Sequence, residues 1–434
     1  MPRQLAAIRP QLFPNPSYYG WVIVGVGFLC SALTSPGQSF VIALYLEPVM
    51  ADLDVTRVEI SSLYAAATLL AAACLPIVGR IADRAPSGIF LGVVVALLGL
   101  ALAGFSAVST VAGLAVSFFF LRLLGQGAVG LGTITATVQW FRRYRGRALA
   151  LVGLGYAFGQ LVYPGMIYGL VDRLGWRGSL LALALVYLFV AAPLVGRLIR
   201  ERRPEDDPVD GARLGHRRHH HLIGEQAETS FALREALRTP VFWGLLVWVA
   251  MLPLVHTAVI FHQVALFSSR GWDAALVPPA FMAYALGGVV MTYLMGLLLE
   301  RRPTRIGLAL SLGLSAVALA AIALPLPPFS GALLYGSLLG IASGAHAATS
   351  SILWPDYFGI EALGAGKGVV GAAVSGATAI GPPVAAVLVA TSGSFDTSLL
   401  LFGSICAVGA LMSLRLHKPV LEPDRAKSTE ASAA

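Results

Sequence analysis

The stretch GRIADR at Gly79–Arg84 returns in the second half of the chain as GLLLER at Gly296–Arg301. The pair Trp140–Phe141 returns as Tyr357–Phe358 at the same separation, which we call the repeat offset. Unrelated landmarks that share one spacing indicate an internal repeat, in which the second half of the chain copies the first. The sequence is therefore best understood as two related halves.

The composition places both halves in a membrane. Of the 434 residues, 57% are hydrophobic and only 12% are charged, whereas a soluble protein carries about 25% charged residues. Each bilayer crossing takes ~20 largely apolar residues and forms a helix, because lipid offers no partners to the backbone. Twelve candidate spans begin near Tyr19, Ile60, Ile89, Ala112, Ala148, Gly178, Val241, Ala275, Ile306, Gly331, Gly368 and Leu399. The sequence therefore predicts an all-α integral membrane protein with two pseudo-symmetric six-helix bundles.

The positive charges predict the orientation of these spans. The net charge is +8, and 25 of the 30 Lys and Arg residues fall on one side when the loops are assigned to alternate sides. Four fall on the other side, and Arg122 lies within a span. Loops rich in Lys and Arg stay in the cytoplasm, so both termini are expected there, in a multi-pass protein of the plasma (inner) membrane. Because the basic charge follows from topology, nucleic acid is not an expected partner.

The same boundaries predict five regions along the chain. These are a cytoplasmic N-terminus at 1–17, a six-helix bundle at 18–200, a cytoplasmic linker at 201–233, a second bundle at 234–416 and a cytoplasmic tail at 417–434. The linker contains a histidine cluster at His216–His221, which we interpret as a solvated loop because it lacks the fixed spacing of a metal site. No metal site is expected elsewhere either.

Two polar features interrupt the first half. The first span is broken by Ser35-Pro36-Gly37-Gln38, and its copy, the seventh span, carries Pro253 at the equivalent position. Bends at both positions would flank one central cavity, although a bend can also be a simple packing kink. The fourth span carries Arg122 and, one helical turn later, Gln126. A membrane arginine generally faces a cavity, a partner or a substrate, and the alternative is an arginine held by backbone carbonyls.

The second half contributes histidines. His256 and His262 lie in the seventh span and His346 in the tenth, and His262 is the repeat counterpart of Tyr45. No Asp or Glu lies near a predicted midplane. If transport is coupled to protons, these histidines are therefore the candidate proton carriers. The alternative is that they are packing residues.

The repeated GRIADR motif predicts a conformational latch. An acid–base pair at a helix end can hold a neighbouring helix terminus and release it during a conformational change. The candidate latch residues are Gly79, Asp83 and Arg84 in the first half and Glu300 and Arg301 in the second. The alternative is an ordinary anchor at the membrane interface.

Several strings resemble the major facilitator superfamily over essentially the whole chain. They are GRIADR, WFRRYRGRALALVGLG from Trp140, GWR at Gly175–Arg177 and FHQVALFSSRGW at Phe261–Trp272, and they are similar to the monocarboxylate and oxalate/formate porter branch. In that branch a cation on the eighth helix commonly binds the carboxylate. This chain departs from the pattern, because Ala275–Leu299 contains no Arg, Lys, Asp or Glu.

We therefore expect a secondary transporter that carries a small organic anion by alternating access, with a proton as a candidate second cargo. Arg122 would pair with the anion, with Lys367 as the other candidate cation. The expected cavity residues are Gln126, Tyr45, Tyr156, His262 and Tyr284.

Two alternatives remain from the sequence. One is an efflux transporter for an apolar or aromatic compound, and the other is a non-transporting sensor that binds a partner through 201–233. An enzyme is not expected, because the sequence holds no nucleophile–base grouping, metal-ligand spacing or phosphate loop. Neither a cofactor nor a second chain is needed, so a monomer is the default expectation.

Overall fold

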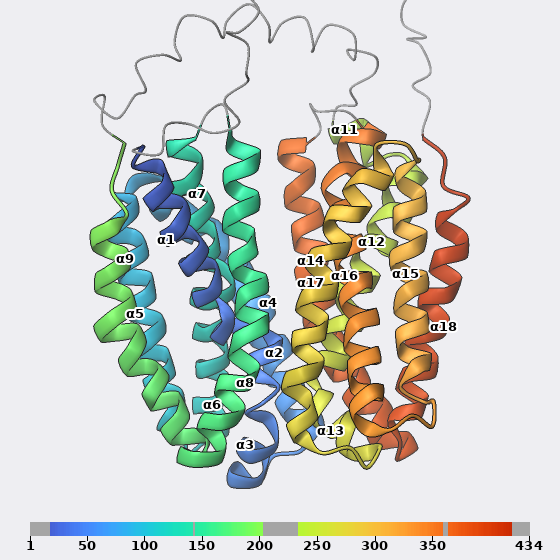
Figure 1. Cartoon of the computed structure of the whole chain (residues 1–434), viewed down its shortest axis with the longest axis horizontal. Coiled ribbons are helices and arrows are strands. Elements are labelled where there is room, and N and C mark those ends of the chain that lie inside the picture. The colour runs from blue at the N-terminus through green and yellow to red at the C-terminus, as the bar shows by residue number, and fades with distance from the viewer. Residues whose placement is uncertain (1–17, 142–143, 203–232, 359–362, 419–434) are drawn as a thin grey trace, which may run out of the picture. The chain divides into compact units, whose positions relative to one another are not determined.

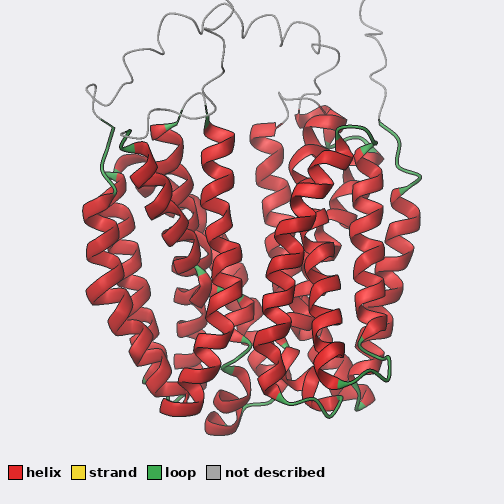
Figure 2. Cartoon of the chain, in the orientation of Figure 1, coloured by secondary structure: helices red, strands yellow, loops and turns green. Residues whose placement is uncertain are grey.

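A computed structural model describes residues 18–141, 144–202, 233–358 and 363–418, and these residues form helices and loops with no strand among them. Figure 2 shows the helices, joined by short loops. The predicted 1–17 terminus, the core of the 201–233 linker with His216–His221, and the end of the tail lie outside the described residues.

The helices of the first half begin within a few residues of the predicted positions. Their bounds are α1 Gly20–Leu33, η2 Ser35–Gly37, α2 Ser39–Ile42, α3 Leu46–Leu53, α4 Arg57–Arg84, α5 Ser87–Ser106, α6 Val111–Phe120, η3 Leu121–Val129, α7 Gly130–Trp140, α8 Arg145–Val186, η4 Tyr187–Ala191 and α9 Ala192–Leu198. Those of the second half are α11 Leu233–Ala236, α12 Pro240–Phe261, α13 Gln263–Ser269, η6 Ala274–Leu276, α14 Val277–Leu299, α15 Thr304–Ala321, α16 Pro328–Phe358, α17 Leu363–Ser392 and α18 Phe395–Ser413.

The prediction of twelve spans is confirmed. Ten segments of the described chain are long and apolar enough to cross a bilayer. One of them, Arg145–Leu198, is 54 residues long and contains two crossings, which meet at Gly175 with φ 68° and ψ 172°. The twelfth crossing is α16, which has 31 residues and is rich in glycine, alanine and serine.

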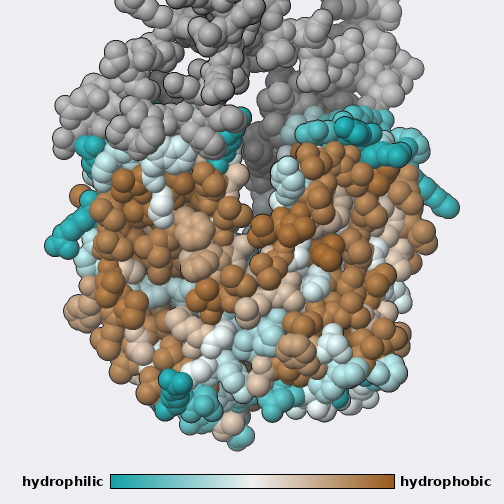
Figure 3. All heavy atoms as spheres, viewed as in Figure 1, coloured by the Kyte–Doolittle hydropathy of each residue, from teal (hydrophilic) through white to brown (hydrophobic). Residues whose placement is uncertain are grey.

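Apolar side chains cover the outside of the helices, as a protein in lipid requires. Phe189, Leu400 and Tyr293 are largely exposed, with relative areas of 72%, 71% and 69%. Figure 3 shows hydrophobic residues along the middle of the helices and hydrophilic residues gathered at their ends. This distribution matches a hydrocarbon layer between two polar interfaces.

The repeat is visible in local geometry. Asp54 and Gly271, which are separated by the repeat offset, both adopt the left-handed conformation, with φ of 51° and 70°. Tyr45 and His262 share the same spacing and both cap a short helix, α3 and α13 respectively.

A pair of hydrogen bonds repeats as well. The Ser87 hydroxyl at the start of α5 contacts Gln139 Oε1 at 3.1 Å, and the Thr304 hydroxyl at the start of α15 donates to Asp356 Oδ2 at 2.7 Å. Both members of the second pair follow those of the first by the repeat offset. The two halves therefore fasten the same helix ends in the same way.

The predicted break in the first span is confirmed. Helix α1 ends at Leu33, and the chain continues through the 3₁₀ turn Ser35–Gly37. Pro253 lies inside α12, which runs without a break from Pro240 to Phe261, and the interruption of the seventh span follows at His262.

The contacts divide the chain into two compact units. Of the described residues, unit 1 holds those up to Val41, those of 70–163 and those of 169–202, and unit 2 holds the others, including Ile42–Leu69. This grouping differs from a division of the sequence into 18–200 and 234–416. The two divisions differ because side chains from the first half of the sequence pack on the second half within unit 2. One example is Tyr64, whose ring centroid lies 4.5 Å from that of Phe261.

Each unit has its own tight helix contacts. In unit 1, α5 packs along α9 (Figure 1). In unit 2, α14 packs along α16, where Gly336, Gly340 and Gly344 face backbone oxygens of α14 so closely that an added Cβ would lie 2.1–2.2 Å from them. Small residues allow this approach, as in other membrane helix pairs.

Candidate functional site

A cavity of about 480 Å³ lies in unit 1 and is lined from three directions. The broken first span supplies Ser31, Thr34 and Gln38, η3 and α7 supply Gln126, Gly130, Thr133 and Ile134, and α8 supplies Leu149, Val152, Gly153 and Tyr156. In each group the residues recur at three-, four- and seven-residue intervals. Side chains at these intervals share one face of a helix, so three helix faces meet around the cavity.

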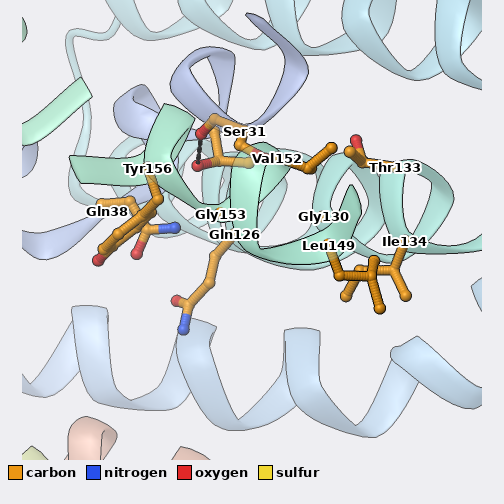
Figure 4. A pocket seen from close by; sticks show the side chains of 11 residues that line it. Ser31, Gln38, Gln126, Gly130, Thr133, Ile134, Leu149, Val152, Gly153 and Tyr156 are labelled. Atoms are coloured by element: carbon orange, nitrogen blue, oxygen red, sulfur yellow. Dashed lines mark hydrogen bonds between the residues drawn. The ribbon is translucent and has the colours of Figure 1, made fainter. Parts of the chain in front are cut away.

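The cavity is amphipathic. Figure 4 shows the polar ends of Gln38 and Tyr156 well separated from the apolar pair Leu149 and Ile134. The lining contains amides, hydroxyls and one phenol, but no Asp, Glu, Lys, Arg or His among the described residues. A small molecule with one polar end and a short apolar body suits such a surface.

Arg122 lies behind this lining rather than in it. The side chain is 4% exposed, and its Nη1 donates to Gly37 O at 2.9 Å. Gly37 precedes the lining residue Gln38, and Gln126 follows Arg122 by one turn. In the part of the chain that the structure describes, Arg122 is the single buried residue among the Asp, Glu, Lys and Arg residues.

The helix that carries Arg122 has an unusual backbone. Leu121–Val129 forms a π-helix, which inserts extra residues into a helical turn and is frequent at functional sites. Gly37 enters this widened turn, because a Cβ on Gly37 would lie 2.3 Å from Leu121 O and 2.8 Å from Gly125 Cα. The broken first span and the π-helix therefore form one joint, which Arg122 fastens.

The glycines of α8 pack tightly against α1. A Cβ on Gly155 would lie 2.0 Å from Phe28 O, and one on Gly159 would lie 2.4 Å from Ser35 Oγ. This close approach fixes Tyr156, which lies between them, against the cavity.

Other predicted site residues lie in unit 2. His256 Nε2 is 2.9 Å from Ser315 Oγ, and its ring centroid is 6.4 Å from that of Tyr284. His346 Nε2 is 3.2 Å from Ser350 Oγ. The structure thus gathers His256, Tyr284 and His346 in the core of unit 2, whereas Gln126 and Tyr156 meet at the cavity of unit 1.

His262 and Tyr45 are more deeply enclosed. His262 is 1% exposed, and its Nε2 is 3.0 Å from Pro382 O. Tyr45 is 2% exposed at the start of α3. Neither residue lines the unit 1 cavity. Lys367 falls within α17, and its side chain lies outside the described residues.

The candidate latch residues lie at helix ends. Gly79, Asp83 and Arg84 belong to the last turns of α4, and Glu300 and Arg301 directly follow α14. Asp83, Arg84, Glu300 and Arg301 are exposed, as a reversible contact requires.

Sequence reasoning missed Ser31, Thr34 and Thr133 in the cavity, and it missed Ser315 beside His256. The cavity hydroxyls follow a helical spacing, which was the available signal. For Ser315 the signal was the repeat itself, since its counterpart in the first half is the apolar Leu98.

Comparison with known proteins identifies the family. A family model, the Major Facilitator Superfamily, matches residues 27–339 and 271–433. The chain belongs to the major facilitator superfamily. It is therefore a multi-pass membrane protein of a transporter family, with a small molecule as cargo and the lipid bilayer as its surroundings. Members of this superfamily are generally not enzymes.

Its relatives connect it to monocarboxylate porters. The chain is 26% identical to monocarboxylate transporter 11 of Homo sapiens over 96% of this chain and 87% of that protein. It is 24% identical to the MFS-type transporter opdF of Penicillium oxalicum over 68% of this chain and 66% of that protein. This major facilitator is thus similar in sequence to a monocarboxylate transporter over nearly its full length.

A solved structure shares the fold. A bacterial homolog of the human lysosomal transporter Spinster, in an inward-facing and unoccupied conformation, superimposes with a TM-score of 0.73 at 16% identity. The match covers 93% of this chain and 98% of that one. The predicted architecture of two six-helix bundles is therefore confirmed as a major facilitator fold.

Proposed function

We propose that this major facilitator is a secondary active transporter for a small organic anion of the monocarboxylate type, which it moves by alternating access. The observation that carries the proposal is the amphipathic cavity of unit 1 with the buried charge of Arg122 directly behind it. The amides of Gln38 and Gln126 and the Tyr156 hydroxyl would bind the polar end of the anion. Leu149 and Ile134 would contact its apolar body.

Arg122 can stabilise an anion in the cavity without touching it. A charge in the low-dielectric interior acts over a longer range than one in water. Arg122 also holds Gly37, so that it positions the neighbouring Gln38. Its proposed role therefore combines a favourable field for the anion with the shaping of the cavity wall.

The remaining parts of the proposal concern the whole transport cycle. Residues 18–200 and 234–416 would form the two moving bundles, joined by 201–233 in the cytoplasm together with the termini 1–17 and 417–434. The exposed pairs Asp83–Arg84 and Glu300–Arg301, with Gly79 at the first of them, would close contacts in one state and release them in the other. Tyr45 and His262 would line the path rather than the resting cavity.

The test is uptake of labelled monocarboxylates into vesicles that carry the wild-type protein or Arg122→Gln. We expect saturable uptake of at least one acid by the wild type. In the variant the uptake rate should fall about tenfold or more, because the loss of one charge–dipole interaction of ~1.4 kcal/mol corresponds to a factor of ten. The panel would include acids with short apolar chains and acids with aromatic rings.

Arg177→Gln is the matched control. Arg177 is also an arginine of unit 1 that is held by backbone carbonyls, with Nη1 and Nη2 at 3.1 Å and 2.9 Å from Val108 O, but it does not border the cavity. If uptake fell equally in both variants, the cause would be a general loss of folded protein, which would contradict a role of Arg122 at the cavity. A selective loss in Arg122→Gln supports it.

The uncharged lining favours one alternative, the efflux of a neutral apolar or aromatic compound. Under this alternative no acid is taken up, and membrane vesicles instead accumulate an aromatic dye whose transport is lost in Gln126→Leu. Deletion of 201–233 separates both transporters from a sensor, because a transporter keeps its flux without this segment.

A further inference from the structure

One wall of the unit 1 cavity carries three kinds of residue in a fixed order. Tyr156, Gly153 and Leu149 of α8 line the cavity. They are three and four residues apart, so they share one face of the helix. This wall therefore presents a hydroxyl, then a position without a side chain, and then an apolar side chain.

A second wall repeats this order. Gln126, Gly130 and Ile134 line the cavity from η3 and α7, each four residues after the one before. Helix α8 follows α7 in the sequence and crosses the membrane in the opposite direction, so the polar, open and apolar positions of both walls follow one another in the same direction in space. Figure 4 shows Leu149 and Ile134 at the same end of the cavity, away from Tyr156.

The packing of the helices does not require the two glycines. A Cβ added to Gly130 or Gly153 would meet open space outside the backbone of its own helix. Gly155 is different, because a Cβ there would lie 2.0 Å from Phe28 O. Glycine inside a helix is also less stable than alanine. Glycine at these two positions therefore has another reason.

The repeat shows that such helices can carry side chains at these positions. Gly130 corresponds to Ala347 of α16, and Gly153 corresponds to Val370 of α17. Both counterparts lie well inside long helices of the second half. The first half keeps open two positions that the second half fills, and both open positions border the cavity. The open space is thus a property of the cavity rather than of the fold.

Two threonines of the lining have no proton to offer to a cargo. The Thr34 hydroxyl donates to Ser31 O at 2.7 Å, and the Thr133 hydroxyl donates to Val129 O at 2.7 Å. Both donors are therefore used within the local backbone. An apolar chain that lies against these threonines leaves no donor unpaired.

The separation of the polar and apolar ends gives a length. Seven residues of α8 lead from Leu149 to Tyr156, which is about 10 Å in an α-helix. A straight carbon chain advances about 1.3 Å per bond, because C–C bonds of about 1.5 Å meet at tetrahedral angles. An acid whose carboxylate is bound at Tyr156 therefore brings about its sixth to eighth carbon to Leu149. The cavity of about 480 Å³ has room for such a molecule.

We propose that the cargo is a monocarboxylate with an extended apolar chain of about six to eight carbons, and that Gly130 and Gly153 determine which chain lengths are accepted. This inference rests on the proposed function and names the substrate class of its cavity. The carboxylate lies at Tyr156, the chain passes the two glycines, and its end contacts Leu149. Shorter acids reach only the polar end and bind more weakly.

The first experiment measures how affinity depends on chain length. Straight-chain acids from acetate to decanoate compete with one labelled acid for uptake into vesicles that carry the protein. We expect the wild type to gain about three- to fourfold in affinity for each added methylene up to the proposed length and nothing beyond it, because each buried methylene contributes a similar free energy. An affinity that is highest for acetate or propionate would overturn the inference and leave anion transport intact.

Gly153→Val is the decisive variant. Valine is the residue of the second half at this position, so a helix of the repeat accommodates it. The added side chain would stand in the path between Tyr156 and Leu149. We expect the acid that binds best to the wild type to lose about tenfold in affinity, while the affinity for butyrate stays within about twofold. Gly130→Ala, which also installs the residue of the second half, should cause a smaller loss of the same kind.

Gly169→Val is the matched control. Gly169 lies on the same helix and an added Cβ there also meets open space, but this residue does not line the cavity. The variant should keep the wild-type dependence of affinity on chain length. Equal changes in Gly169→Val and Gly153→Val would overturn the inference, as would a wild-type dependence in Gly153→Val.

Leu149→Ala tests the other end of the chain. The smaller side chain lengthens the space beyond the glycines, so the acid that binds best should become longer by about two carbons. An unchanged best acid would show that the chain ends elsewhere and would overturn the inference.

A second measurement needs no transport. A ligand that binds only the folded protein raises its melting temperature. This rise should be largest for acids of the proposed length in the wild type and for shorter acids in Gly153→Val. A rise that does not depend on chain length would overturn the inference, even where an acid is taken up. The proposed length dependence without any uptake would support the assignment of the cavity and contradict its role in transport.

Discussion

Arg122 and Gly37 show how one residue pair can join two irregular helices. The Arg122 guanidinium binds the carbonyl of Gly37, and Gly37 itself enters the widened turn of η3. Both the 3₁₀ turn of the first span and the π-helix of the fourth leave backbone groups outside the regular helix pattern. The joint gives such groups a partner, which lipid cannot offer.

We predict that Gly37→Ala weakens this joint. The new methyl group would lie 2.3 Å from Leu121 O and 2.7 Å from Gln126 N, so either the turn or η3 must move. Overpacking of this kind lowers the free energy of unfolding by about 1–3 kcal/mol. The measurement is the melting temperature of the purified protein, followed by uptake of the transported acid.

Gly25→Ala on α1 is the control, because a Cβ at Gly25 would meet open space outside the backbone of its own helix. This variant should melt at the wild-type temperature or slightly above it, since alanine is the better helix former. A Gly37→Ala protein that melts and transports like Gly25→Ala would show that the joint tolerates movement.

At the scale of the helix, the contact between α14 and α16 depends on three glycines. Gly340 packs on Tyr284, where an added Cβ would lie 2.1 Å from the Tyr284 carbonyl oxygen. We predict that Gly340→Ala separates the two helices and lowers the melting temperature, with Gly371→Ala on α17 as a control that meets open space. A Gly340→Ala protein with unchanged stability would contradict the close packing.

The repeated hydrogen bond at the start of α15 gives a graded prediction. Asp356 accepts from Thr304 at 2.7 Å and pairs with Lys418 at 2.6 Å, and its repeat counterpart is Gln139. Asp356→Gln keeps the hydrogen-bond acceptor and loses an ion pair whose lysine is 59% exposed. The free energy of unfolding should therefore fall by less than ~1 kcal/mol.

Asp356→Ala loses the hydrogen-bond acceptor as well, so its free energy of unfolding should fall by about 1 kcal/mol more than that of Asp356→Gln. Thermal unfolding of the two variants beside the wild type measures this order. An Asp356→Ala protein as stable as Asp356→Gln would show that the bond to Thr304 contributes nothing.

The sequence predicted the helices well because each is long, apolar and repeated. It also located the break at Ser35–Gln38, where proline and glycine act locally. It did not predict that the seventh span is interrupted at His262 rather than at Pro253, because neither residue alone fixes where a buried helix ends. Nor did it predict the π-helix, the cavity hydroxyls or the partners of His256, because these depend on which helix faces meet, and hydrophobic periodicity is uninformative when every face is apolar.

For the whole molecule, the compact units do not follow the order of the chain. Residues Ile42–Leu69 come from the first half of the sequence but pack within unit 2. In this segment Ile60 and Tyr64 are fully buried, and the Tyr64 ring lies 4.5 Å from Phe261. The second half of the sequence therefore lacks part of its own packing surface when it is made alone.

We predict that a chain cut within residues 201–233 works only when both pieces are made together. Co-expressed pieces should be recovered as one complex and should transport, because the helices supply the contacts. Either piece alone should be degraded, since the first exposes Tyr64 and the second exposes Phe261. Tyr64→Ala should reduce recovery of the complex, whereas Tyr293→Ala, at a ring that is 69% exposed, should not. Two pieces that are each stable alone and do not associate would contradict the packing of Ile42–Leu69 against the second half.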